Sequence, residues 1–91
     1  NLVVMYVIAV YDVESKRCAK MLKLCRRYLH WVQNSVFEGE ITAVHLRELR
    51  NAAREIMDER TDSLIIFQNR DKHWLSKEVI GCEKASTEQF L

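Results

Sequence analysis

An unbroken run of apolar, mostly β-favouring residues near the start of the chain constrains the fold most, and it ends abruptly on a carboxylate. The run reads Met5-Tyr6-Val7-Ile8-Ala9-Val10-Tyr11, and Asp12 follows it. A strand that is apolar on both faces is covered on both sides or lies at an interface, so its first charged residue marks where the chain reaches the surface. The run therefore predicts a buried strand with Asp12 at its tip, and Asp12 is the first candidate for chemistry.

Length and composition indicate one globular domain, residues 1–91. Of the 91 residues, 48% are hydrophobic and 30% are charged, and the chain has no proline and only two glycines. Connections between elements are therefore expected to be short. The longest apolar run, 2–11, is well short of the roughly 18 to 20 residues that cross a bilayer, and it lacks the flanks of a signal peptide. We expect a soluble, cytoplasmic protein without membrane contacts.

The cysteines and histidines show none of the spacings of a metal site. Three cysteines are an odd number without a CxxC pair, so neither a disulfide framework nor a zinc site is indicated, and we expect buried, reduced thiols. The three histidines are scattered over different segments and are expected at the surface. These residues are Cys18, Cys25, Cys82, His30, His45 and His73.

A helix is predicted directly after the first strand, with Ser15 or Asp12 as its N-cap. Its apolar residues recur at helical spacing, and basic residues cover the other side without an acid between Glu14 and Glu38. Such a basic face is typical of a solvated helix or, because it creates a positive field that the net charge of +1 conceals, of a surface that binds phosphate backbones. The apolar residues are Cys18, Met21, Leu22, Cys25 and Leu29, and the basic residues are Lys16, Arg17, Lys20, Lys23, Arg26 and Arg27.

A second strand and a second helix follow. Alternating side chains predict a strand over Trp31–Glu38, which Glu38-Gly39-Glu40 is expected to end. Thr42 is a good N-cap for the next helix, whose outer face has both signs of charge and looks solvated. The buried stripe predicted for this helix is Leu46, Leu49, Ala53 and Ile56.

The last third of the chain predicts two more strands. The segment Asp62–Gln68 is apolar on both faces at its centre, so we expect a strand that is central or covered. Val79–Cys82 is predicted to be a short strand in which a glycine indicates a bulge or a close backbone approach. The tail, 83–91, is polar until Phe90-Leu91, so we expect it to dock on this chain or on a partner.

This order of elements predicts an α+β, ferredoxin-like βαββαβ sandwich. It has a four-stranded antiparallel sheet with both helices on one face, and a short extra C-terminal strand or tail. The other face of such a sheet needs a cover. Because the first and third predicted strands are apolar on both sides, face-to-face homodimerisation is the expected cover.

Several of these segments resemble the CRISPR-associated Cas2 family. They are Tyr11-Asp12 at the end of the first strand, Arg17 five residues beyond the acid, and the string Gln33-Asn34-Ser35-Val36-Phe37-Glu38-Gly39. Val79-Ile80-Gly81 and the chain length also fit. The resemblance runs from about residue 5 to the end, and it implies a small ferredoxin-like homodimer that acts in spacer acquisition beside the CRISPR integrase.

The resemblance also implies a magnesium-dependent phosphodiesterase activity on RNA or DNA, with Asp12 as the catalytic, metal-binding acid. It implies that Tyr11, Ser35 and Phe37 support that acid and that Arg17 helps to hold the nucleic acid. The chain departs from the family in having Trp31 where many members have an arginine, and in extra residues at 2–4. The other expected nucleic-acid contacts are Lys16, Lys20, Lys23 and Arg27.

One aspartate binds Mg²⁺ weakly, whereas a two-fold axis near the strand ends would bring together Asp12 from both chains of a dimer. Two close carboxylates repel unless a proton or a cation lies between them, so we predict a Mg²⁺ site shared across the dimer. The simpler alternative is that Asp12 caps the first helix or hydrogen-bonds the loop.

Three functions therefore compete: the dimeric nuclease, a non-catalytic dimeric scaffold that bridges integrase subunits and holds duplex DNA, and an RNA-recognition or small-ligand regulatory domain. The third has the least support, because no RNP-like aromatic pair lies on the central strands and no glycine-rich turn offers a pocket.

Overall fold

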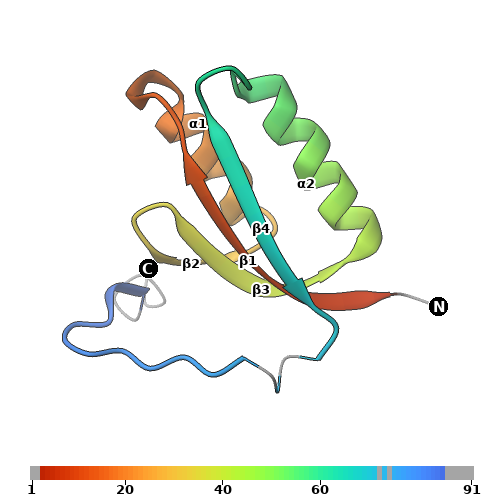
Figure 1. Ribbon diagram of the computed structural model, residues 1–91, viewed down its shortest axis with the longest axis vertical. Coiled ribbons are helices and arrows are strands. Elements are labelled where there is room, and N and C mark those ends of the chain that lie inside the picture. The colour runs from red at the N-terminus through yellow and green to blue at the C-terminus, as the bar shows by residue number, and fades with distance from the viewer. Residues whose placement is uncertain (1–2, 72, 74, 86–91) are drawn as a thin grey trace.

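Four strands and two helices follow one another along the chain in a ferredoxin-like order (Figure 1). The computed structural model describes residues 3–71, 73 and 75–85. The elements are β1 (Val4–Asp12), α1 (Ser15–Arg26), β2 (His30–Gln33), β3 (Val36–Thr42), α2 (Ala43–Ile56) and β4 (Ser63–Asn69). The predicted α+β class and βαββαβ order are confirmed.

The strands form one antiparallel sheet in the order β2-β3-β1-β4, so β1 lies in its interior. Val7 pairs with Gly39 of β3 on one side and with Gln68 of β4 on the other. The strand predicted from the apolar run at the start of the chain is therefore confirmed as the centre of the sheet.

The hydrophobic core lies between the sheet and the two helices, which cover the same face (Figure 1). Alternate residues of β1, namely Val7, Ala9 and Tyr11, are buried on this face. The helices contribute the buried side chains Met21, Leu24, Cys25, Leu46, Leu49 and Ala53.

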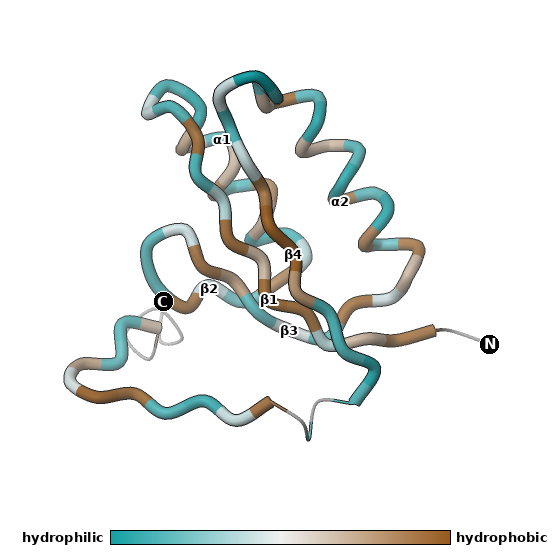
Figure 2. Tube along the Cα trace, viewed as in Figure 1, coloured by the Kyte–Doolittle hydropathy of each residue, from teal (hydrophilic) through white to brown (hydrophobic). Residues whose placement is uncertain are grey.

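The opposite side of the sheet, which we call the open face, has no helix over it. Paired residues of an antiparallel sheet share a face, so the pairs Ile8–Phe67 and Val10–Ile65 lie on the open face. Ile65 is 51% exposed and Phe67 is 58% exposed. Neighbouring stretches of β1 and β4 are hydrophobic along the chain (Figure 2).

The single strand predicted over Trp31–Glu38 is wrong, because a two-residue turn splits it into the hairpin β2–β3. Asn34 lies in this turn with a φ of 46°, a conformation that asparagine tolerates better than most residues. Gly39 does not end the strand either, since it pairs with Val7 in the middle of β3. The missing Cβ matters there, because one would lie 3.3 Å from the His30 ring.

Two predictions for the last third of the chain are also wrong. The strand β4 lies at an edge of the sheet and is not a central strand. Val79–Cys82 is irregular, not a strand, and the hairpin supplies the fourth strand instead. The preceding residues are tied to the sheet by an ion pair of 2.9 Å between Lys77 Nζ and Glu38 Oε1. Phe90 and Leu91, the predicted docking residues, lie outside the described residues.

The predictions for α2 are confirmed. The Thr42 hydroxyl accepts a hydrogen bond from the His45 backbone N–H at 3.1 Å, as an N-cap does. Leu46, Leu49 and Ala53 are buried, and Ile56 is partly buried.

The stripe on α1 differs from the prediction in part. Cys18 is exposed, whereas Leu24 is buried. Burial raises the pKa of the Cys25 thiol to about 11, so this thiol stays protonated and unreactive. The buried-thiol prediction holds for Cys25 and is wrong for Cys18 and Cys82.

The three histidines are exposed, as predicted. Within the described part of the chain, no helix has both the length and the hydrophobicity to cross a membrane.

Candidate active site at the end of β1

Asp12 is the last residue of β1, and it pairs with Ser63 at the start of β4. Its side chain is exposed. Within residues 3–71, 73 and 75–85, its carboxylate makes no hydrogen bond or ion pair. The alternative in which Asp12 caps α1 is therefore wrong: the N-cap is Glu14, without a capping side chain. Ser15 does not cap the helix either, since it is already its first residue.

Asp12 belongs to the open face of the sheet. Side chains alternate along a strand, and Tyr11 and Ala9 point into the core. Asp12 therefore lies on the same side as Val10 and its paired neighbour Ile65, at the edge of the exposed apolar surface. The carboxylate of Asp12 therefore reaches solvent, while the backbone of Asp12 stays fixed in the sheet.

Tyr11 and Phe37 lie on the other side of the sheet from Asp12. Phe37 is fully buried, and its ring stacks on Tyr11 with 6.1 Å between centroids and 25° between planes. Burial raises the pKa of Tyr11. Ser35 contacts the backbone of β1 directly, because its carbonyl oxygen accepts a hydrogen bond of 3.2 Å from the Tyr11 N–H. These residues support the end of β1 from the core.

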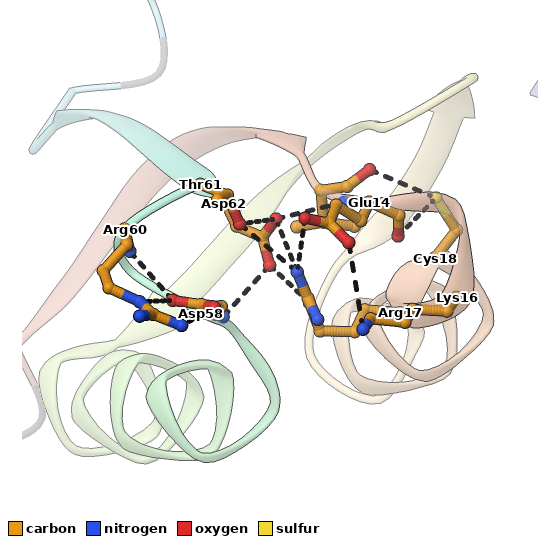
Figure 3. A network of polar contacts seen from close by, with 9 residues as sticks. Glu14, Lys16, Arg17, Cys18, Asp58, Arg60, Thr61 and Asp62 are labelled. Carbon is orange, nitrogen blue, oxygen red and sulfur yellow. Dashed lines mark hydrogen bonds and ion pairs between the residues drawn. The ribbon is translucent and has the colours of Figure 1, made fainter.

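A buried carboxylate that the sequence did not reveal lies beside this strand end. The Asp62 side chain has no exposed surface, and Figure 3 shows that it meets donors from α1 and from the loops that precede α1 and β4. Its Oδ2 accepts from Arg17 Nε at 2.6 Å and from the Asp58 N–H at 3.0 Å. Its Oδ1 accepts from Arg17 Nη2 at 3.1 Å, from the Glu14 N–H at 3.0 Å and from the Thr61 hydroxyl at 3.2 Å.

These donors keep Asp62 ionised. The hydrogen bonds from Arg17 lower the pKa of Asp62 most, burial opposes them, and the N–H groups of Asp58 and Glu14 lower the pKa further. Asp62 also places a negative charge at the start of α1, where the helix dipole favours it. Asp62 accepts the N–H of Glu14, the N-cap residue itself, and not an N–H of the first helical turn, so it does not replace the side-chain cap that the sequence assigned to Ser15 or Asp12.

Arg17, which the resemblance links to nucleic acid, makes its main contacts inside the protein. Its side chain is only 14% exposed and pairs with Asp62, and its Nη2 lies 3.6 Å from Glu14 Oε1. The hydrogen bond with Asp62 raises the pKa of Arg17. No pattern within α1 indicates this pairing, because its partner lies 45 residues away.

The other basic residues of α1 remain at the surface. Lys16, Lys20, Lys23 and Arg27 are exposed. Lys16 Nζ lies 3.9 Å from Glu14 Oε2, and the Arg27 guanidinium lies 5.7 Å from the centre of the Tyr28 ring. The predicted basic face is therefore present without Arg17.

Trp31, at which the chain departs from the resemblance, packs on the hairpin. Its Nε1 donates to the Asn34 carbonyl oxygen at 2.9 Å, and the Arg26 guanidinium lies 6.0 Å from its ring centre. The indole therefore helps to close the β2–β3 turn.

The donor chemistry at Asp12 suits Mg²⁺. This ion prefers oxygen ligands and is usually held by one or two carboxylates, with water and phosphate completing its shell. In the described part of one chain, no three His, Cys, Asp or Glu side chains come together as a metal site. Asp12 has the right atoms in an exposed position, and no residue that the structure describes competes for its carboxylate.

Comparison with known proteins places this geometry in a family. Residues 5–77 match the family model described as "CRISPR associated protein Cas2". A protein of Fusobacterium nucleatum named CRISPR-associated endoribonuclease Cas2 is 39% identical over 96% of this chain and 87% of its own length. A protein of Methanosarcina acetivorans with the same name is 39% identical over 96% of this chain and all of its own length. A solved structure described as "Crystal structure of cas2" superposes with a TM-score of 0.82 at 41% identity, over 90% of this chain and 92% of that one.

Proposed function

The chain belongs to the CRISPR-associated protein Cas2 family, and on that basis we propose that it is a Mg²⁺-dependent endonuclease of CRISPR adaptation. In this proposal a homodimer hydrolyses phosphodiester bonds in RNA or DNA and works beside the CRISPR integrase. The relatives are named endoribonucleases. The observation that supports a nuclease site in this chain is the exposed carboxylate of Asp12 at the edge of the open face, which has no partner among the described residues.

The homodimer is proposed from the same surface. Ile65 and Phe67 expose more than half of their surface on the open face, and a second copy packed there removes this apolar area from water. Because Asp12 lies on the same face at the end of the central strand, a two-fold axis near the strand ends brings both Asp12 side chains to one place. Their repulsion then favours a cation between them.

Mg²⁺ held by the two Asp12 carboxylates supplies positive charge against the phosphoryl oxygens and lowers the pKa of a water molecule. The protein's part is to hold Asp12 in place and to bind the substrate. The β1–β4 pairing, which ends on the pair Asp12–Ser63, fixes the backbone of Asp12, and the exposed lysines of α1 attract the phosphate backbone.

The experiment is a titration of Mg²⁺ into the purified protein by calorimetry, coupled to a cleavage assay on RNA and on duplex DNA. We expect one metal per two chains, cleavage that EDTA stops, and recovery when Mg²⁺ is added back. Cleavage that continues in EDTA, or a stoichiometry of one metal per chain, would contradict the shared site.

A second candidate function, the scaffold, is favoured by the basic face of α1. In this proposal the dimer bridges integrase subunits and holds duplex DNA, and Asp12 is dispensable in the cell. Lys20 and Lys23 are exposed and have no partner within the described residues. Free lysines on one helix surface suit electrostatic contact with a DNA backbone.

Charge reversal on this face separates its role from that of Asp12. Lys20→Glu and Lys23→Glu are each expected to raise the Kd for duplex DNA about 5- to 10-fold, with a shallower dependence on salt, because each lysine contact releases a counterion. Fluorescence anisotropy between 50 and 200 mM salt measures both quantities.

The matched control for these variants is Arg47→Glu, which reverses an exposed charge on α2. If Arg47→Glu weakened DNA binding as much as the lysine variants do, the effect would come from net charge rather than from the α1 face. In cells, the scaffold predicts that spacer acquisition falls with the lysine variants and survives Asp12→Asn, whereas an essential nuclease predicts that acquisition is also lost with Asp12→Asn.

A further inference from the structure

Asp62 extends the pairing of β1 with β4 beyond the last backbone partners. The ladder ends at the pair Asp12–Ser63. The next residue back from Ser63 is Asp62, and its carboxylate accepts the N–H of Glu14, two residues beyond Asp12. The chain is therefore held on both sides of Asp12, by the sheet before it and by a buried side chain after it.

Arg17 completes this arrangement from the first turn of α1. Its Nε and Nη2 both bond to the carboxylate that holds Glu14, and its own N–H bonds to the Glu14 carbonyl oxygen at 2.9 Å. A guanidinium that binds a carboxylate through two nitrogens fixes both distance and orientation. Asp62 and Arg17 thus hold the loop between β1 and α1 at Glu14 (Figure 3). This leaves the loop little freedom to turn Asp12 away from its place.

We propose that Asp62 and Arg17 are positioning residues for Asp12: together they hold the loop at residues 12–14, so that the catalytic carboxylate keeps one direction, and Arg17 makes no contact with nucleic acid. This inference rests on the proposed nuclease function. It assigns a role to Asp62 and changes the role that the resemblance implied for Arg17.

The two roles for Arg17 predict opposite effects of a change at Asp62. If Arg17 binds phosphate, Asp62→Asn weakens its internal partner and frees the guanidinium, so nucleic acid binds more tightly. If Arg17 positions Asp12, Asp62→Asn loosens the loop, so cleavage slows while binding does not change. Misplacement of a reacting group by about 1 Å can cost about 100-fold in rate.

The experiment compares wild type with Asp62→Asn, and Glu59→Gln is the matched control. The control removes a negative charge from the same loop, but the Glu59 side chain is exposed and makes no hydrogen bond or ion pair to a described residue. We expect Asp62→Asn to lower the single-turnover cleavage rate about 10- to 100-fold. We expect the Kd for nucleic acid, measured in EDTA, to stay within about 2-fold of wild type, and we expect the control to change neither quantity.

Arg17→Lys is a milder variant for the case in which Asp62→Asn does not fold. Lysine keeps the positive charge that a phosphate contact requires, but it cannot bind the Asp62 carboxylate through two nitrogens. The positioning role predicts a slower rate at unchanged Kd, whereas a phosphate contact predicts a nearly normal rate. Tighter binding by Asp62→Asn, or wild-type cleavage by both variants, would overturn the proposal.

Hydrogen exchange at the Glu14 amide tests the clamp independently of any activity. This N–H donates to Asp62, so exchange is expected to speed up about 10-fold or more in Asp62→Asn and to be unchanged in Glu59→Gln. Absence of cleavage by wild type would reject the nuclease function. Hydrogen exchange at Glu14 would still test whether Asp62 holds the loop. Unchanged exchange at Glu14 would reject the clamp even in an active enzyme.

Discussion

Asp12→Asn is expected to lower Mg²⁺-dependent cleavage about 100- to 1000-fold and to leave the fold and the dimer intact. The amide keeps the shape of the side chain but loses the charge that holds a divalent cation, and metal stabilisation of phosphoryl transfer amounts to several kcal/mol. The fold is expected to survive because the carboxylate is exposed and makes no hydrogen bond or ion pair to any described residue. Initial rates on RNA and duplex DNA measure the loss, and size exclusion with circular dichroism checks the structure.

Asp71→Asn is the matched control for this variant. Asp71 is an exposed aspartate beyond the far end of β4, which pairs with the start of β1 rather than with Asp12. It is expected to cleave at the wild-type rate. Wild-type cleavage by Asp12→Asn as well would point to a contaminating nuclease or to a site elsewhere on the chain.

The strand that presents Asp12 was predictable because its signal is local. Seven consecutive apolar residues have few alternatives to a central strand, and the first charge after them marks the surface. Thr42 was predictable for a similar reason, since a capping hydroxyl acts within three residues of itself. Features of this kind depend on neighbours in sequence.

The errors in the sheet have two physical causes. The β2–β3 turn lacks glycine, so the segment around Asn34 looked like one continuous strand, although asparagine can adopt the positive φ that the turn needs. In β4, Ile65 and Phe67 gave the pattern of a covered strand in a sheet whose open face has no cover within the chain. We infer that this pattern reflects the dimer that we propose.

Asp62 was missed because its role depends on contacts that sequence spacing does not show. Its main partner, Arg17, lies 45 residues away, and another donor, Glu14, lies 48 residues away. In the sequence Asp62 is an acid before an apolar strand, and an aspartate is usually exposed. Only the antiparallel pairing of β1 and β4 brings it beside Asp12.

Phe67→Glu is expected to convert the dimer into a monomer. Burial of a large apolar side chain contributes roughly 2 kcal/mol, and a two-fold axis counts each substitution twice, so the loss is about 4 kcal/mol per dimer, or close to 1000-fold in Kd. The cost of burying two glutamates adds to this loss. Analytical ultracentrifugation over a range of concentrations measures the shift.

Val44→Glu provides a control of equal exposure. Val44 is 55% exposed on α2, against 58% for Phe67 on the open face, so both variants place a charge at a comparable solvent-exposed apolar site. The control is expected to remain dimeric. A dimer that persists in Phe67→Glu would place the interface on another surface.

Cleavage by the Phe67→Glu monomer then tests whether the metal is held by one Asp12 or by two. Each Phe67→Glu chain keeps its own Asp12, with the same pairing to Ser63 and the same loop beyond it. If one carboxylate were enough, the monomer would cleave at the wild-type rate per chain. If the site is shared, activity falls in parallel with the dimer fraction and returns at concentrations at which the variant reassociates, because only association supplies the second Asp12.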